Sequence, residues 1–395
     1  MSVVDDHIGT RIAYWRKRRG GMTQAVLAGL AGLSQPYISQ VESGRKGIER
    51  RSTLVAIARA LQVSVADLLA GPADPTDPRR AAADAAVPTL RAVLAEVAEG
   101  ERRPPTMAPE EFDDAVDRLA GLRARADYAS MAPLLPEALL NAAHDGHRLA
   151  RVGYDAGDVL KNLGYPDLAL AAARVAVRAA LDDGDPGWIG AARYFYTAAL
   201  PVEAASLKSR VAARSLAELQ AHAADPRARQ MLGQLHLSAS LACAVDERSE
   251  DAHAHLRAAE DEARTLGDPS DGVGFNLAAF GPTNIGLWHM TVAAELGEHG
   301  RVVELARGLQ PGRLKVADRH YAYWLHYGAA LAHSGRHDRE ALAAFMHAER
   351  AAPLPFSVNQ LARSAMSAMV RRAKRQGVPD DLRIIARRLG IEIAA

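Results

Sequence analysis

Residues 23–44 read TQAVLAGLAGLSQPYISQVESG and predict two short helices joined by a tight turn. Gly32 stands in the turn, where a positive φ costs glycine least. Ser34 is a ready N-cap for the second helix, and Pro36 falls in its first turn, where no intrahelical hydrogen bond is lost. Ala28 is small enough for two helices to cross over it. The apolar residues that lock the second helix onto the first are Leu27, Leu33, Ile38 and Val41.

The outer face of the second helix carries small amide and hydroxyl side chains. Gln35 and Gln40 lie on this face, and a glutamine amide can donate to and accept from adenine in the major groove of DNA. The alternative for such a row is an ordinary solvated helix face. Because the row follows the tight turn, we expect a helix-turn-helix that reads base edges.

Further helices surround this unit. We expect a first helix over 8–19 and two more over 52–61 and 64–69, which makes residues 1–70 a compact five-helix domain. Three prolines and two aspartates between Gly71 and Arg80 break the helical pattern, so 71–87 is predicted to be a linker. A helix is expected at about 88–101, and residues 88–395 form the second domain.

From residue 108 onward the pattern is helical in pieces separated by Gly, Pro or Asp, with no convincing strand. The clearest unit spans 321–354, where Trp324 and Gly328 precede a turn at Gly335 and Phe345 follows it. This unit resembles a tetratricopeptide repeat. Weaker two-helix units cover 150–183, 187–221, 233–266 and 282–311. We therefore expect an all-α chain in which five or six helical hairpins stack as a solenoid.

Composition and charge narrow the classes of protein further. The formal net charge is +1, yet residues 1–71 carry a net +5 and the rest a net −4. A basic front end on an acidic body suits binding to a polyanion such as DNA. Cys243 is the single cysteine, which fits a reducing cytosol. With neither a signal peptide nor a long apolar run, we expect a cytoplasmic protein with no membrane partner.

Residues 8–70 resemble the Xre/Cro-type repressor domain. The positions that carry the resemblance are Gln24, Ala28, Gly32, Ile38, Ser39, Val41, Glu42 and Gly44. With the hairpins that follow, the chain resembles the tetratricopeptide regulators of Gram-positive bacteria, some of which sense peptide pheromones. Within that class it is most similar to the large group of such proteins in actinomycetes. Two segments depart from the family pattern. Gly20-Gly21 adds a residue between the first and second helices, and residues 47–52 replace the Pro-Ser usually seen before the fourth helix.

The resemblance assigns roles within the DNA-binding domain. It implies a structural pair between Arg16 and Glu42, with Lys17 as a possible substitute for the arginine. It also implies a phosphate contact for Gln24. The base-contacting positions that it implies are Ser34, Gln35, Pro36, Ser39 and Gln40. Residues expected to follow the DNA backbone are Tyr37, Arg45, Lys46, Arg50 and Arg51, for which the alternative is ordinary surface solubility.

The second domain offers polar and aromatic residues on the first helices of its hairpins, which line the concave face of a solenoid. Candidates for contact with an effector are Arg193, Tyr194, Tyr196, His236, Asn284, Trp288, His289, Tyr323 and Tyr327. Structural roles compete with this interpretation, and for Trp188 and Trp324 we expect a place in the core.

No set of residues predicts an enzyme, a cofactor or a metal. The chain has neither a glycine-rich phosphate loop followed by lysine nor a His-Glu-x-x-His motif. His253 and His255 are two residues apart and point away from each other on a helix. Cys243 lies in an alanine-rich helical segment, and we expect it to be a small core residue. An enzyme with a hidden site is the least favoured class.

The sequence therefore predicts a sequence-specific DNA-binding regulator of transcription. Its second domain is expected to bind a signal, either a peptide or a small molecule, and to form a homodimer that reads inverted half-sites. The alternative is a DNA-binding adaptor whose solenoid docks a protein partner. The operator, the effector and the sign of regulation are left open.

Overall fold

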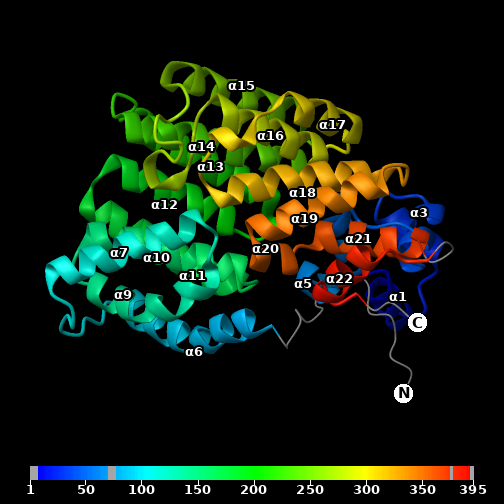
Figure 1. Cartoon of the computed structure of the whole chain (residues 1–395), viewed down its shortest axis with the longest axis horizontal. Helices are drawn as coiled ribbons and strands as arrows, with labels where there is room; N and C mark the ends of the chain where they lie inside the picture. The colour runs from blue at the N-terminus through cyan, green and yellow to red at the C-terminus, as the bar shows by residue number, and fades with distance from the viewer. Residues whose placement is uncertain (1–7, 70–76, 374–376, 392–395) are drawn as a thin grey trace.

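The computed structural model describes residues 8–69, 77–373 and 377–391, and within these ranges all regular elements are helices. We call residues 8–69 the head and the remaining described residues the body (Figure 1). The all-α prediction is therefore confirmed. The head contains five helices, which are α1 (Ile8–Arg18), α2 (Gln24–Leu30), α3 (Gln35–Glu42), α4 (Arg51–Leu61) and α5 (Val65–Leu69).

Local signals in the sequence start and stop the head helices. Thr23 accepts a hydrogen bond from the Val26 amide and caps α2, and Ser34 does the same for the Tyr37 amide at the start of α3. Gly32 has a φ of 66°, as the turn requires. The predicted cap and the predicted glycine turn are both confirmed.

The head has its own apolar core. Ile12 of α1, Leu27 of α2, Ile38 and Val41 of α3 and Ile57 of α4 are fully buried in it. Burial of a large aliphatic side chain contributes about 1.5–3 kcal/mol, so these residues hold α3 against α1 and α2 and fix which of its faces points outward.

Helix α6 (Pro78–Ala98) corrects the predicted linker. Residues 78–87 are helical, and the helix expected at about 88–101 begins and ends earlier. The Asp77 side chain accepts a hydrogen bond from the Arg79 amide, and Pro78 occupies the first turn. Aspartate and proline thus start a helix here, although their pattern was interpreted as a break. Residues 71–76 lie outside the described residues.

The body continues with three helices and a series of hairpins. The first three are α7 (Pro109–Ala124), α8 (Tyr128–Met131) and α9 (Leu135–Ala142). Five hairpins follow in the described chain: α10 (Gly146–Asn162) with α11 (Pro166–Asp183), α12 (Pro186–Ala199) with α13 (Ala205–Gln220), α14 (Pro226–Val245) with α15 (Ser249–Leu266), α16 (Pro282–Glu295) with α17 (His299–Gly308), and α18 (Ala317–His333) with α19 (Asp338–Ala351). The last helices are α20 (Pro353–Ser357), α21 (Gln360–Ala373) and α22 (Asp380–Arg388).

Small residues allow the helices of the hairpins to approach closely. A Cβ added at Gly328 of α18 would lie 3.1 Å from the ring of Phe345 in α19 and 3.3 Å from the Ala341 carbonyl. Gly328 thus lets α18 and α19 approach each other beside Ala341. Gly157 of α10 makes the same room for the ring of Phe195 in α12.

The stack of hairpins curls until its later helices meet its earlier ones (Figure 1). The Tyr128 hydroxyl of α8 donates to Asp318 of α18 at 2.7 Å. Ala352 and Leu354 join the core formed by α6 to α11. This curl is consistent with a solenoid whose inner face is partly filled by its own side chains. Among the described helices, none has the length and apolarity to cross a membrane.

Candidate nucleic-acid interface

Helix α3 presents its polar face to solvent at the edge of the head. Ser34, Gln35, Pro36 and Gln40 are exposed, and Ser39 is half-buried between them. The opposite face of α3 is buried through Ile38 and Val41. The five residues predicted to read bases thus lie together on one outward surface. Base contact itself stays a prediction.

A polar network behind α3 holds part of this surface in place. Arg16 binds Glu42 with two hydrogen bonds, from Nε to Oε1 at 2.6 Å and from the terminal nitrogen to Oε2 at 2.8 Å. The hydrogen bond to Glu42 raises the pKa of Arg16. Gln24 donates to Glu42 at 2.8 Å and accepts from the Gln35 amide at 3.0 Å. The predicted Arg16–Glu42 pair is confirmed, and it anchors Gln24 and Gln35 to the head.

Three of the residues predicted to follow the DNA backbone lie in α3 or just beyond its end: Tyr37 is in its first turn, and Arg45 and Lys46 follow it. Arg45 is exposed, and the Lys46 ammonium lies over the ring of Tyr37, 5.2 Å from its centroid. Burial, and after it the charge of Glu49, raises the pKa of Tyr37, so the phenol stays neutral. These side chains place positive charge beside the outward face of α3, where phosphates flank a major groove.

Arg50 and Arg51 contact the body, although both were predicted to follow the DNA backbone. Arg50 donates to the Glu295 carbonyl at 2.7 Å and to the Glu247 carboxylate at 3.2 Å. Arg51 binds the Glu295 carboxylate at 3.0 Å, and the Ser52 amide donates to the same group at 3.1 Å. Glu295 is only 2% exposed, so its charge is matched within the protein. Phosphate contact by the two arginines stays a prediction.

Other contacts complete what we call the head–body junction, the surface where residues 44–65 meet the body. The Val65 amide donates to Glu203 at 3.0 Å, and Val202 packs against the head core. Gly44 and Gly47 lie against Arg371 and Ser364 of α21, where a Cβ would have no room. Figure 1 shows the head at the end of the body near α21 and α22.

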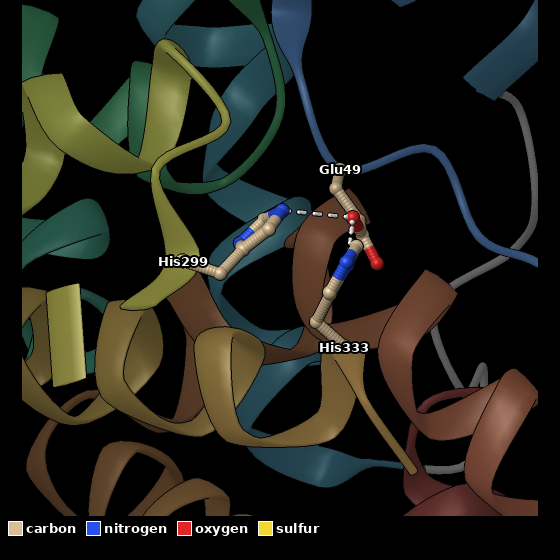
Figure 2. A group of neighbouring side chains, drawn as sticks. All are labelled: Glu49, His299 and His333. Atoms are coloured by element: carbon tan, nitrogen blue, oxygen red, sulfur yellow. Dashed lines mark hydrogen bonds and ion pairs between the residues drawn. The ribbon is translucent and has the colours of Figure 1, made fainter. Parts of the chain in front are cut away.

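Glu49 of the head lies between two histidines of the body in this junction (Figure 2). Its Oε2 is 3.1 Å from Nε2 of His299 and 2.7 Å from Nδ1 of His333. The two imidazole rings are stacked with their centroids 3.9 Å apart. Burial opposes ionisation of Glu49, but the hydrogen bonds and charges of the two histidines lower its pKa overall.

The residues predicted to bind an effector are spread over several places in the body. Asn284 is fully buried and donates to the Ala278 carbonyl at 3.4 Å, and the Tyr323 hydroxyl donates to the Ala306 carbonyl at 3.0 Å. Trp288 and Tyr327 pack partly buried against core clusters. The two predicted histidines have side-chain partners: His236 meets His255 at 3.0 Å, and His289 meets Glu260 at 2.7 Å. Trp188 is buried, as expected, and Trp324 is partly buried and stacks on His347.

The other three predicted residues line cavities. Arg193 and Tyr196 line a cavity of about 540 Å³ between α11, α12 and α13, together with Arg174, Arg178, Arg214 and Glu218. Tyr194 lines a smaller cavity of about 100 Å³ inside the curl of the body. The structure therefore does not gather the nine residues into one site, and their binding role stays a prediction.

The smaller cavity is lined by several charged side chains, which the sequence did not point to. Asp158, Lys161, Asp318 and Arg319 line it, with Arg123 beside them. Burial, followed by the charge of Asp158, raises the pKa of Asp318. Within the described residues, Oδ1 of Asp318 and Nε of Arg319 have no hydrogen-bond partner. Unpartnered buried polar atoms are costly unless a ligand or water satisfies them.

Comparison with known proteins places the head in a recognised class. Residues 7–70 match a family model described as a helix-turn-helix domain. The match covers α1 to α5 and includes all residues predicted to contact DNA. Comparison with curated proteins finds no match. The chain thus carries a helix-turn-helix domain at its N-terminus, followed by a long helical region.

Proposed function

We propose that this protein is a sequence-specific DNA-binding regulator of transcription of the Xre/Cro type. The observation that carries the proposal is the outward face of α3, where Ser34, Gln35, Pro36 and Gln40 lie exposed beside Arg45. In a helix-turn-helix the second helix enters the major groove and its polar side chains meet base edges. Basic side chains beside that helix neutralise phosphates, which supplies affinity without sequence preference.

The body is proposed to be a tetratricopeptide-like sensor that binds an effector. The small cavity supports this role, because it combines Tyr194 with two charged side chains whose buried atoms, Asp318 Oδ1 and Arg319 Nε, lack hydrogen-bond partners within the described chain. A peptide or small molecule with complementary polar groups would satisfy those atoms. The effector changes DNA affinity only if it binds two shapes of the body differently.

The proposal includes a homodimer that binds inverted half-sites. One helix-turn-helix domain contacts few bases, and two-fold pairing places two recognition helices about 34 Å apart, or a multiple of that distance, along one face of DNA. The tetratricopeptide-like body is the part of the chain that would hold two heads at such a spacing.

Selection of bound sites from random DNA with the purified full-length protein tests the DNA-binding role. We expect enrichment of a motif with two inverted halves. The matched control is the Gln35→Ala/Gln40→Ala double variant, which keeps the net charge and should bind DNA without enriching that motif. If the unmodified protein returns the input distribution of sequences, the proposed function is wrong.

A further inference from the structure

We infer that Glu49, His299 and His333 form a site for one divalent transition-metal ion of the zinc class, shared between the head and the body. One ligand atom from each residue lies within 4.8 Å of the other two. Oε2 of Glu49 lies 3.1 Å from Nε2 of His299 and 2.7 Å from Nδ1 of His333. Figure 2 shows both imidazole nitrogens directed at the same carboxylate oxygen of Glu49.

The chemistry of the three ligands selects the class of ion. Two imidazoles and one carboxylate form a common ligand set for zinc, with a fourth position left to water. Calcium and magnesium prefer oxygen ligands in larger numbers, so this set does not suit them. Bonds of about 2.0–2.2 Å in a tetrahedral site place ligand atoms roughly 3.3 Å apart. Starting from 3.1 and 2.7 Å, the distances from Glu49 to His299 and His333 need to widen by about 0.2 and about 0.6 Å.

The protons on the two imidazoles can move so that a metal ion replaces the hydrogen bonds to Glu49. Because an ionised carboxylate only accepts hydrogen bonds, Nε2 of His299 and Nδ1 of His333, which both face Oε2 of Glu49, must carry the protons in this pairing. An ion needs a lone pair on each of these nitrogens, so each imidazole must carry its proton on the other ring nitrogen. Neutral histidine can make this change of tautomer without a net change of charge.

The ligands come from three separate elements of the chain. His299 is the first residue of α17 and His333 is the last residue of α18, so two helix ends of the body hold the imidazoles. Glu49 belongs to the segment between α3 and α4 of the head. An ion bound to all three fixes the head against the body at a point just beyond α3. Because zinc binding requires this docked arrangement, zinc stabilises the docked arrangement by mass action.

The test uses the untagged full-length protein after treatment with a chelator. Cobalt chloride is titrated first, because tetrahedral cobalt gives a visible absorption band, and zinc chloride is then added to displace the cobalt. We expect one ion per chain for both metals and a higher thermal unfolding midpoint with zinc. X-ray absorption of the zinc-loaded protein should show two imidazole ligands, a readout that needs no variant.

Variants locate the site. Glu49→Gln and His333→Asn should each weaken zinc binding by more than about a hundredfold, since loss of an outer partner alone costs 10–100-fold. The matched control is His253→Asn, because His253 bonds the Ser249 carbonyl of its own helix α15. Absence of stoichiometric binding, an absorption spectrum without imidazole ligands, or equal weakening in the His253 variant would each overturn the inference.

The effect of the ion on DNA binding rests on the proposed function. DNA affinity of the unmodified protein is therefore measured separately, with zinc and with chelator. Zinc binding without any DNA binding would contradict the proposed function and leave the metal site intact. DNA binding without zinc binding would contradict the metal site and leave the proposed function intact.

Discussion

At the scale of single residues, the three glutamines of the helix-turn-helix are held to different degrees. Gln24 and Gln35 belong to the network of Arg16 and Glu42, which fixes their amides before any ligand arrives. Gln40 lies one turn further along α3 and is exposed. Residues fixed by a network lose less entropy on binding, whereas an exposed amide must order itself at the interface.

Gln40→Ala tests base reading at this position. We expect a loss of about 1–3 kcal/mol in the preference for the selected site over random DNA, because a bidentate amide contact contributes that much discrimination. Affinity for random DNA should stay nearly unchanged, since the net charge is the same. The measurement is competitive fluorescence anisotropy with both DNAs, and an unaltered preference would contradict the assignment.

The buried ring of His326 should make the stability of the protein depend on pH. The ring is buried, and burial together with the charge of Arg51 lowers its pKa to about 3. In the unfolded chain the imidazole takes up a proton below about pH 6.5, whereas the folded protein does not until about pH 3. Stability is therefore lost as the pH falls from 6.5 toward 3, by up to about 1.4 kcal/mol per pH unit for this group.

His326→Phe should reduce that dependence, because the variant has no imidazole to protonate. Thermal unfolding midpoints at pH 7 and pH 4.5 check the result. The difference between the two midpoints should shrink relative to the unmodified protein and stay unchanged in the control His253→Asn. An equal difference in all three proteins would show that His326 is not held neutral by the fold.

At the scale of elements, glycines set how closely helices of the body pack. A Cβ added at Gly157 of α10 would run into the ring of Phe195. A Cβ added at Gly121 of α7 would have a nitrogen of the Arg125 side chain, 3.7 Å away, as its nearest contact. Both glycines are inside helices, where alanine has the higher intrinsic propensity. Replacement by alanine should therefore favour the helix at both positions, but tight packing opposes it only at Gly157.

Gly157→Ala should lower the free energy of unfolding by about 1–3 kcal/mol, because the added methyl group forces Phe195 out of its place. Gly121→Ala should raise it by about 0.8–1 kcal/mol through helix propensity alone. Chemical denaturation of the two full-length variants checks both signs. Stabilisation by Gly157→Ala would mean that α10 and α12 are less tightly packed than the structure shows.

At the scale of the whole molecule, the head is tied to the body through charge pairs. Arg50 and Arg51 are held by Glu247 and Glu295, so the guanidiniums that the sequence assigns to DNA are engaged by the body in this arrangement. Under the proposed function, DNA phosphates and the body would compete for the same two side chains.

Glu295→Gln should weaken the hold of the body on Arg51, whose partner is the Glu295 carboxylate, whereas Arg50 keeps the Glu295 backbone carbonyl and Glu247. We expect the logarithm of DNA affinity to fall more steeply with the logarithm of salt concentration, by about one unit of slope for each arginine that gains a phosphate. The control is Glu304→Gln, because Glu304 is exposed and pairs with Arg301 on the surface of α17. If both variants show the slope of the unmodified protein, Arg51 does not reach a phosphate.

Local features of the fold were predictable from the sequence because neighbouring residues encode them. The N-cap at Ser34, the turn at Gly32 and the close approach at Gly328 each depend on a few residues and on helical periodicity. The start of α6 was missed because a proline after an aspartate signals a helix start as well as a break.

The junction between the head and the body could be found only in the tertiary structure. Arg51 pairs with a residue 244 positions away, and Glu49 with one 284 positions away. No spacing or composition marks such pairs, because each depends on the summed angles of five stacked hairpins. The sequence by itself determined the helices and the face of α3 that points outward, through hydrogen bonds and burial within short segments. Only the tertiary structure, through the curl of the whole body, determined which residues of the body meet the head at the head–body junction.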